Sequence, residues 1–334
     1  MEKKTTTRKS SPRKSAQSAL ASVAAGIAGI LLAVWIIYGT VTVDPFRWGV
    51  FAEELIVALC ALFALRLLCV IRLPKWIPLV CIILLPTAIV LYGMIPLPGD
   101  SASWIRVACV ASAAAFALLT AQQLDNKPDG VLLTALLLGI SLPVVLSAQT
   151  RLLDEMMRAL LIAGLFMCVL AVRQKSSWLA YLAAVAFALA GAASLSAAFA
   201  GLGAGVGVLL LAPKRKRGSW VFAAVLMGAL PVAAWFASRA LLPQASLLFL
   251  LNEASAGEFV FVVQVHLLRA LAVGLFALAI RFFISREDAA IPLVLALLGC
   301  AVARLLPFAA APEVWMDAFP LCVLAGVGVA KAAR

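Results

Sequence analysis

Residues 178–212 read WLAYLAAVAFALAGAASLSAAFAGLGAGVGVLLLA, a run of 35 residues without a charge. Basic residues stand at both ends of the run, at 173–175 and at 214–217. Because cytoplasmic loops carry an excess of Lys and Arg, the run must cross a membrane twice if both basic clusters are cytoplasmic. Glycines permit the tight hairpin and the close helix approach that this requires. They are Gly191, Gly201, Gly203, Gly205 and Gly207.

The rest of the chain has the same apolar character. Its 334 residues are 65% hydrophobic and 13% charged, whereas soluble domains are about half apolar and about a quarter charged. Since a helix needs about 20 residues to cross the hydrocarbon layer, we expect an all-α, polytopic transmembrane helical bundle of about 12 spans, within a range of about 10–12. The predicted spans are 19–41, 50–71, 76–95, 104–121, 131–148, 156–172, 178–195, 198–212, 219–240, 259–282, 290–308 and 315–331.

The charges predict the orientation of this bundle. With both termini cytoplasmic, 20 of the 27 Lys and Arg residues fall on the inner side, and 10 of the 15 acids fall outside. The net charge of +12 therefore indicates topology and not a nucleic-acid partner. Residues 1–18 predict a disordered basic tail against anionic lipid, and 19–334 predict one membrane domain. We expect an integral, multi-pass plasma-membrane protein.

The first polar cluster follows the first predicted span. In a short helix on the outer surface, Asp44, Arg47 and Glu54 share one face, because they recur at helical spacing. A carboxylate and a guanidinium would then face one pocket at the membrane boundary. The alternative is structural: Asp44 followed by Pro45 is typical of a helix start, and Arg47 can simply pair with Glu54.

A second polar cluster begins in the outer loop near residue 252. Glu258, His266 and Arg269 lie on one helix stripe, and Glu253 precedes them. His266 is a candidate base or metal ligand, and its alternative is a hydrogen-bonded packing residue. Two more arginines lie near the outer ends of spans, where they either bind a lipid phosphate or extend to headgroups. They are Arg239 and Arg304.

Other chemistries lack support in the sequence. The single histidine excludes a multi-histidine metal site, and all seven cysteines fall inside apolar runs, where they pack as small hydrophobes. No phosphate-binding loop, nucleophile elbow or zinc motif is present. Hydrolase and NTPase functions are therefore not expected.

The stretch 44–55 resembles a motif of GT-C superfamily membrane glycosyltransferases, notably protein O-mannosyltransferases and aminoarabinose transferases. Their first outer loop has the general form D-E-x-R-Y-A-x-x-x-R-E-M, and Asp44, Arg47 and Glu54 match it, while Pro45 replaces the second acid. Further similar stretches are 201–214, 230–235 and 319–326. The soluble C-terminal domain common in that family is not expected here, which leaves a reduced or inactive relative as an alternative.

The resemblance implies transfer of a sugar from a polyprenyl-phosphate donor to an acceptor on the outer face. Asp44 would be the base or a metal-associated carboxylate, and Glu54 and Arg47 would shape the site. A divalent metal is compatible with the family, though too few ligands stand here to argue it independently. Side chains to hold the donor phosphate or the substrate would be Arg239, Arg269, Arg304, His266 and Glu253.

Two other function classes are compatible with the same sequence. A small-solute transporter also needs a bundle of short helices, although its ionisable residues usually lie near the midplane. A non-catalytic membrane scaffold of a cell-envelope complex fits the loss of the second acid. The sugar, the acceptor and the oligomeric state are not determined by the sequence.

Overall fold

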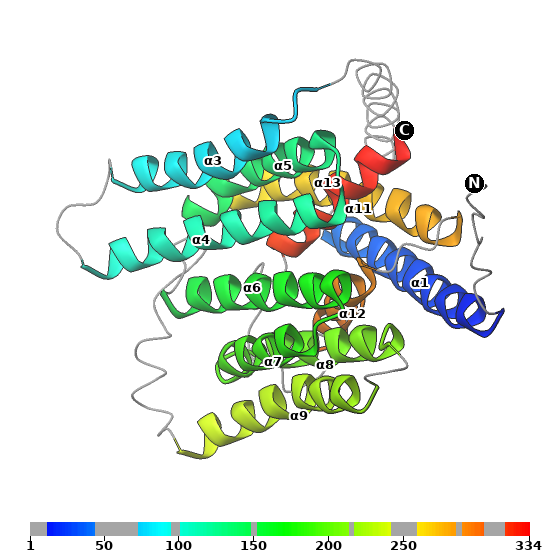
Figure 1. The fold of residues 1–334 in the computed structure, drawn as a ribbon. Helices are drawn as coiled ribbons and strands as arrows, with labels where there is room; N and C mark the ends of the chain where they lie inside the picture. The colour runs from blue at the N-terminus through cyan, green and yellow to red at the C-terminus, as the bar shows by residue number, and fades with distance from the viewer. Residues whose placement is uncertain are drawn as a thin grey trace, which may run out of the picture.

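A computed structural model describes residues 12–43, 73–94, 101–147, 152–213, 217–241, 259–284, 289–303 and 318–334. Within these ranges the chain forms eleven α-helices and no strand, which confirms the all-helical class (Figure 1). The helices are α1 (Pro12–Val43), α3 (Ile77–Met94), α4 (Ser101–Leu124), α5 (Pro128–Ser147), α6 (Leu152–Gln174), α7 (Ser177–Gly191), α8 (Leu195–Leu210), α9 (Arg217–Leu241), α11 (Phe259–Ile284), α12 (Ile291–Ala303) and α13 (Ala318–Ala332).

Each of these helices overlaps one predicted span, and the remaining predicted span, 50–71, lies outside the described residues. The long run 178–212 does divide into two helices, α7 and α8. The break falls where Ser194 accepts a hydrogen bond from the backbone N–H of Ala197 at 3.2 Å. A serine in this position caps a helix start, because it satisfies a backbone donor that has no partner within the helix. α1 begins at Pro12, earlier than the predicted residue 19.

Two hydrogen-bonded contacts fix the directions of the helices that follow α6. Near the starts of α7 and α9, the Tyr181 hydroxyl lies 3.0 Å from both the carbonyl oxygen and the hydroxyl of Ser219. Near their ends, the Ser238 hydroxyl donates to the carbonyl of Ala192. α7 and α9 are therefore parallel. α8 runs in the opposite direction, from the end of α7 to the start of α9.

α1 and α11 pack side by side in opposite directions (Figure 1). Gly26 of α1 faces the ring of Phe283, and one turn later Gly29 faces Ala279. Since both helices rise about 1.5 Å per residue, the last residue of α1, Val43, lies at about the level of the α11 turn 263–266. The end of α1 is therefore level with the first half of α11.

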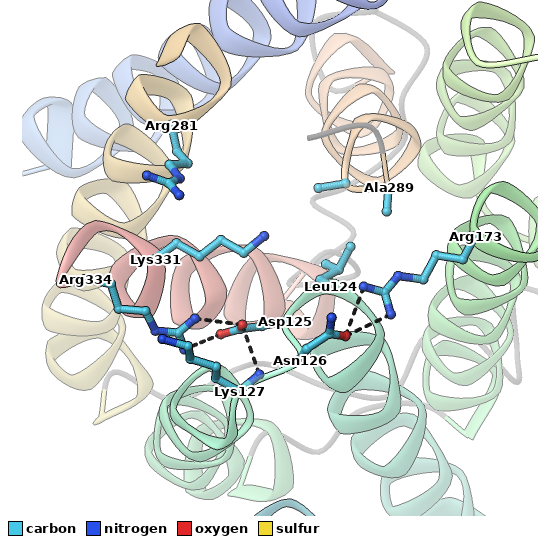
Figure 2. A pocket seen from close by; sticks show the side chains of 10 residues that line it. Leu124, Asp125, Asn126, Lys127, Arg173, Arg281, Ala289, Lys331 and Arg334 are labelled. Carbon is cyan, nitrogen blue, oxygen red and sulfur yellow. Dashed lines mark hydrogen bonds and ion pairs between the residues drawn. The ribbon is translucent and has the colours of Figure 1, made fainter. Parts of the chain in front are cut away.

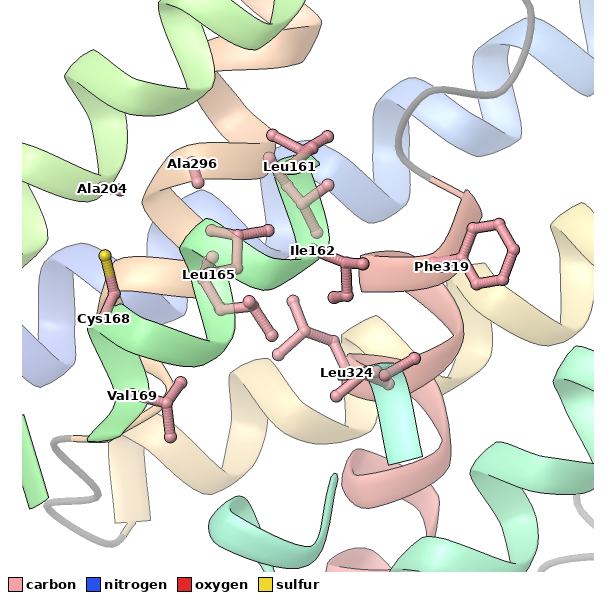
Figure 3. Close-up of a cluster of buried hydrophobic side chains, with 14 of the residues drawn as sticks. Leu161, Ile162, Leu165, Cys168, Val169, Ala204, Ala296, Phe319 and Leu324 are labelled. Atoms are coloured by element: carbon pink, nitrogen blue, oxygen red, sulfur yellow. The ribbon is translucent and has the colours of Figure 1, made fainter. Parts of the chain in front are cut away.

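α6 occupies the middle of the bundle and contacts α4, α7, α8, α12 and α13. Its buried side chains Leu161, Ile162 and Leu165 meet Ala296 of α12 and Leu324 of α13 in one apolar cluster (Figure 3). Much of this interior is alanine, so neighbouring helices approach closely. Small residues are the ordinary means of helix packing in lipid, where burial of apolar surface gives little gain.

The exterior of the bundle is also apolar. Large side chains such as Leu84, Phe222 and Phe236 are about 60% exposed, at 61%, 58% and 62%. Large exposed apolar patches are rare on soluble monomers and mark contact with a membrane or a partner. Three helical segments of the described chain are long and apolar enough to cross a membrane, and eight shorter apolar helices accompany them. The three segments are Trp104–Leu124, Glu155–Gln174 and Arg217–Ser238.

Glycines bring α8 directly against α12. A Cβ atom at Gly203 would overlap the backbone carbonyl of Leu295, and one at Gly207 would lie 2.5 Å from the Cα of Pro292. Gly299 of α12 in turn packs on the carbonyl of Phe199. These contacts confirm the expected close approach, and no flexible side chain is present to yield if a methyl group is added.

We predict that Gly203→Ala separates α8 from α12 and lowers the free energy of unfolding by about 1–3 kcal/mol, the range for overpacking a tight core. Unfolding of the detergent-solubilised protein, followed by circular dichroism, measures the loss. Gly139→Ala is the matched control, since a Cβ at Gly139 meets nothing within 4 Å. Equal stability of the two variants would contradict this packing.

Candidate functional site

A polar cavity of about 420 Å³ opens at one end of the bundle, where α4, α6, α11 and α13 end and α12 begins. Figure 2 shows Lys331 extending across its centre from α13, between Arg281 of α11 and Leu124 of α4. These elements are far apart in the sequence, so the cavity exists only in the folded bundle. It is lined by Leu124, Asp125, Asn126, Lys127, Arg173, Arg281, Ala289, Ala290, Lys331 and Arg334.

The turn between α4 and α5 builds one wall of this cavity. The backbone N–H of Asp125 bonds to the carbonyl of Ala121 at 2.8 Å, which ends α4. The Asp125 carboxylate then accepts from the backbone N–H of Lys127 at 3.2 Å, as aspartates do in turns. Pro128 is the first residue of α5, a position where its missing N–H costs nothing. This local order holds Asp125 nearly buried, at 4% exposure.

Arg334 joins this turn to the end of α13. Its Nη1 and Nη2 donate to the two carboxylate oxygens of Asp125 at 2.9 and 2.7 Å. Its Nε and Nη2 also donate to Asp129 Oδ2 at 3.1 and 2.9 Å. A guanidinium matches two carboxylate oxygens in this forked geometry, and such bidentate pairs are among the stronger hydrogen bonds in proteins.

The environment of Arg334 acts on its pKa in two directions. Burial lowers the pKa, but the hydrogen bonds and negative charges of Asp125 and Asp129 outweigh burial and raise it above its ordinary value. An arginine side chain is in any case cationic at physiological pH. The contact between α13 and the α4–α5 turn therefore does not depend on the titration of the arginine.

A second arginine links α6 to the same turn. Arg173 donates to the side-chain oxygen of Asn126 at 3.3 Å and to that of Gln123 at 3.4 Å. Both acceptors are neutral amides, so these bonds orient Arg173 without cancelling its charge. Around the cavity the described residues place five cationic side chains against the carboxylates of Asp125 and Asp129. Cations therefore outnumber carboxylates among the described side chains at the cavity.

A buried ion pair lies toward the other end of α6. Arg158 Nη1 donates to Glu155 Oε1, and the two side chains are 3% and 0% exposed. Arg173, at the cavity, is 15 positions further along the same helix, or about 22 Å at 1.5 Å per residue. Burial of a charge pair is costly unless its partners are fixed by geometry, so this pair marks a second polar region, on the far side of an apolar middle.

Three predicted site residues lie on described helices of the bundle. Arg239 is near the end of α9, and His266 and Arg269 are in the first half of α11. Because α11 ends at the cavity, where Arg281 stands, His266 belongs to the half of this helix remote from it. Arg239 also belongs to the end of the bundle remote from the cavity, because it adjoins Ser238, whose hydroxyl donates a hydrogen bond at the end of α7.

The other predicted site residues lie outside the described part of the chain. They are Asp44, Arg47, Glu54, Glu253 and Arg304. Only their sequence neighbours locate them: Asp44 follows the last residue of α1, and Arg304 follows the last residue of α12. Both of those helix ends are directed away from the cavity, because α12 begins beside Ala290 and α1 opposes α11.

Sequence reasoning counted the cavity residues as topology markers and did not group them as a site. One signal was present: Asp125 and Asp129 stand one helical turn apart around Pro128. The partner of Asp125 is 209 residues away at Arg334, and no local pattern predicts that pairing. The pair Glu155 and Arg158 was visible as an i, i+3 pair, but nothing in the sequence indicated its burial.

No protein-family model, curated protein or solved structure matches the chain. Among the described residues, no group of three or more His, Cys, Asp or Glu side chains could hold a metal ion. The function proposed for the chain therefore rests on its residues and their arrangement.

We predict that Arg334→Gln lowers the free energy of unfolding by about 1–3 kcal/mol, because two largely buried carboxylates lose their cation. The estimate is below that for a fully buried pair, since the Arg334 side chain is 19% exposed. A double-mutant cycle with Asp125→Asn measures the coupling. Additive effects, within about 0.5 kcal/mol, would show that the two side chains do not interact. Lys75→Gln removes an exposed cation elsewhere and serves as the control.

For the second pair, Arg158→Met should destabilise the protein by about 3–5 kcal/mol, because the buried Glu155 carboxylate loses its arginine partner. Adding Glu155→Leu should restore most of the loss, since both charges are then absent. Thermal unfolding of the single and double variants in detergent provides the comparison. A double variant less stable than Arg158→Met alone would show that Glu155 has a stabilising role apart from this arginine.

Proposed function

We propose that the chain is a multi-span membrane glycosyltransferase. It transfers a sugar from a polyprenyl-phosphate donor to an acceptor hydroxyl, at the end of the bundle opposite the cationic cavity. The cavity end is then cytoplasmic and the transfer end is extracytoplasmic, in a plasma-membrane protein of about twelve spans.

One observation carries the proposal: the end of α1 and the polar half of α11 lie at the same height along the axis of the bundle. Val43, which immediately precedes Asp44, is level with the turn 263–266 of α11. Val43 is therefore level with the half of α11 that carries His266 and Arg269. A carboxylate and a cation from segments distant in sequence are the groups that this chemistry needs.

The distribution of charge along the helices also supports the proposal. α8 and α12 contain no Asp, Glu, His, Lys or Arg, and α6 has none of these residues between Arg158 and Arg173. Ionisable residues in a transporter are usually found near the bilayer midplane. Here the buried Glu155 and Arg158 lie toward the remote end of α6, and apolar turns of that helix separate them from Arg173 at the cavity.

In the proposed reaction the acceptor oxygen attacks the anomeric carbon as the bond from that carbon to the phosphate oxygen breaks. Asp44 accepts the proton of the acceptor hydroxyl, which makes the oxygen a better nucleophile. The departing polyprenyl phosphate gains negative charge, and an arginine such as Arg269 stabilises that charge. Glu54 and Arg47 shape the pocket around Asp44. Inversion at the anomeric carbon follows from a single displacement.

The test is release of polyprenyl phosphate by the purified full chain in nanodiscs, supplied with polyprenyl-phosphate mannose or aminoarabinose and measured by mass spectrometry. Asp44→Asn should lower release by about 10²–10⁴-fold, the contribution of a general base, without changing the thermal midpoint. Glu313→Gln, which removes another acid predicted to lie outside, is the matched control. Release at the wild-type rate from Asp44→Asn would refute the assigned base.

The orientation has its own test in the same protein. A cysteine placed by Asp44→Cys should react with a membrane-impermeant maleimide in intact cells, because the segment is expected outside. Reaction only after the membrane is permeabilised would place the segment in the cytoplasm and would end the proposal.

A further inference from the structure

The cavity at the ends of α4, α6, α11 and α13 is not used by the proposed transfer reaction, which takes place at the other end of the bundle. Its cations are not arranged as isolated residues that only set the orientation of the helices in the membrane. A cation that only anchors a helix extends singly toward headgroups, whereas Lys331 extends across the space between α11 and α4 (Figure 2). The convergence of these side chains is a property of the tertiary structure.

The described side chains at the cavity are mostly cationic. Five cationic side chains line it, and the two carboxylates beside it are both held by Arg334. Among the described side chains there, cations therefore outnumber carboxylates. Like charges gathered into one hollow repel each other, and an anion relieves that repulsion.

The donors also fit one class of anion. Arg173 and Arg281 offer planar, forked donors, which suit phosphate oxygens, and Lys127 and Lys331 offer compact charges. The volume of about 420 Å³ lies within the range of small-ligand pockets, about 300–1,000 Å³. A cavity of this size accommodates more than one phosphate group, or one phosphate together with the group attached to it.

We propose that this cavity binds a phosphate-bearing anion, either the headgroup of an anionic lipid or a soluble phosphate or pyrophosphate compound. Arg334 has a positioning role: by engaging Asp125 and Asp129 it keeps their negative charge away from the ligand and fixes α13, from which Lys331 extends. The proposal is independent of sugar transfer, since it concerns the opposite end of the bundle.

The experiment measures ligand-dependent thermal stabilisation of the full chain in nanodiscs. One arm adds pyrophosphate to discs of phosphatidylcholine, and the other replaces part of the phosphatidylcholine with phosphatidylglycerol. We expect a saturable rise in the thermal midpoint in at least one arm, because a ligand that binds only the folded state stabilises it. A rise with pyrophosphate identifies a soluble ligand, and a rise only with phosphatidylglycerol identifies a lipid headgroup.

Variants localise the effect. Arg281→Gln combined with Lys331→Gln should weaken apparent binding roughly tenfold or more, from the loss of two charged donors. The matched control combines Lys75→Gln and Arg217→Gln, which removes two exposed cations that do not line the cavity. Lys127→Gln, an exposed residue at the rim, provides a second cavity variant if the double variant does not fold.

Three results would overturn the proposal. The first is no ligand-dependent stabilisation in either arm. The second is equal weakening by the cavity and control variants, which would show that binding reflects the overall positive charge and not this site. Retention of stabilisation in the cavity variants with loss in the control would exclude the cavity as well. Sugar transfer and its Asp44→Asn variant are measured separately, so the failure of one proposal is distinguishable from the failure of the other.

Discussion

Backbone approach through small residues is the constraint on which the bundle depends. In a soluble protein, expulsion of apolar surface from water drives the core together, but this chain has apolar side chains both inside and outside, such as buried Leu161 and exposed Leu84. The transfer of such groups between lipid and protein interior gains little. Close contact must then supply the attraction, and it does so where Gly203 and Gly207 admit the backbone of α12. Dispersion falls off steeply with separation, so a single added methyl group at these positions affects the whole contact.

The second organising feature is the concentration of charge at the helix ends. A charge at the bilayer centre costs roughly 2.5–3.5 kcal/mol on insertion scales, so the apolar middle of the bundle limits where polar chemistry can occur. In the network of Arg334, Asp125 and Asp129, both carboxylates pair with one guanidinium. Four further cationic side chains line the cavity. This gathering of cations in one cavity is the basis on which we propose an anion site.

The two polar regions differ in how their charged residues are arranged. At the cavity, cations from α6, α11, α13 and the α4–α5 turn converge. At the opposite end, Arg158 and Glu155 pair within α6, and the end of α1 is level with the first half of α11. In the proposed reaction, the headgroup of a lipid-linked substrate must reach ionised side chains while the lipid tail stays among apolar helices.

The sequence by itself determined the helical class and the helix positions. Charge-free runs of the length of a span can satisfy their backbone hydrogen bonds in lipid only as helices, so even the uninterrupted run 178–212 could be divided correctly from its flanking charges. Only the tertiary structure decided which polar residues meet. Asp125 and Arg334 are joined across 209 residues, and Arg173 meets Asn126 from another helix. Helix propensity and hydropathy are local properties, whereas the direction, register and neighbours of each helix follow from packing between surfaces that are far apart in the chain.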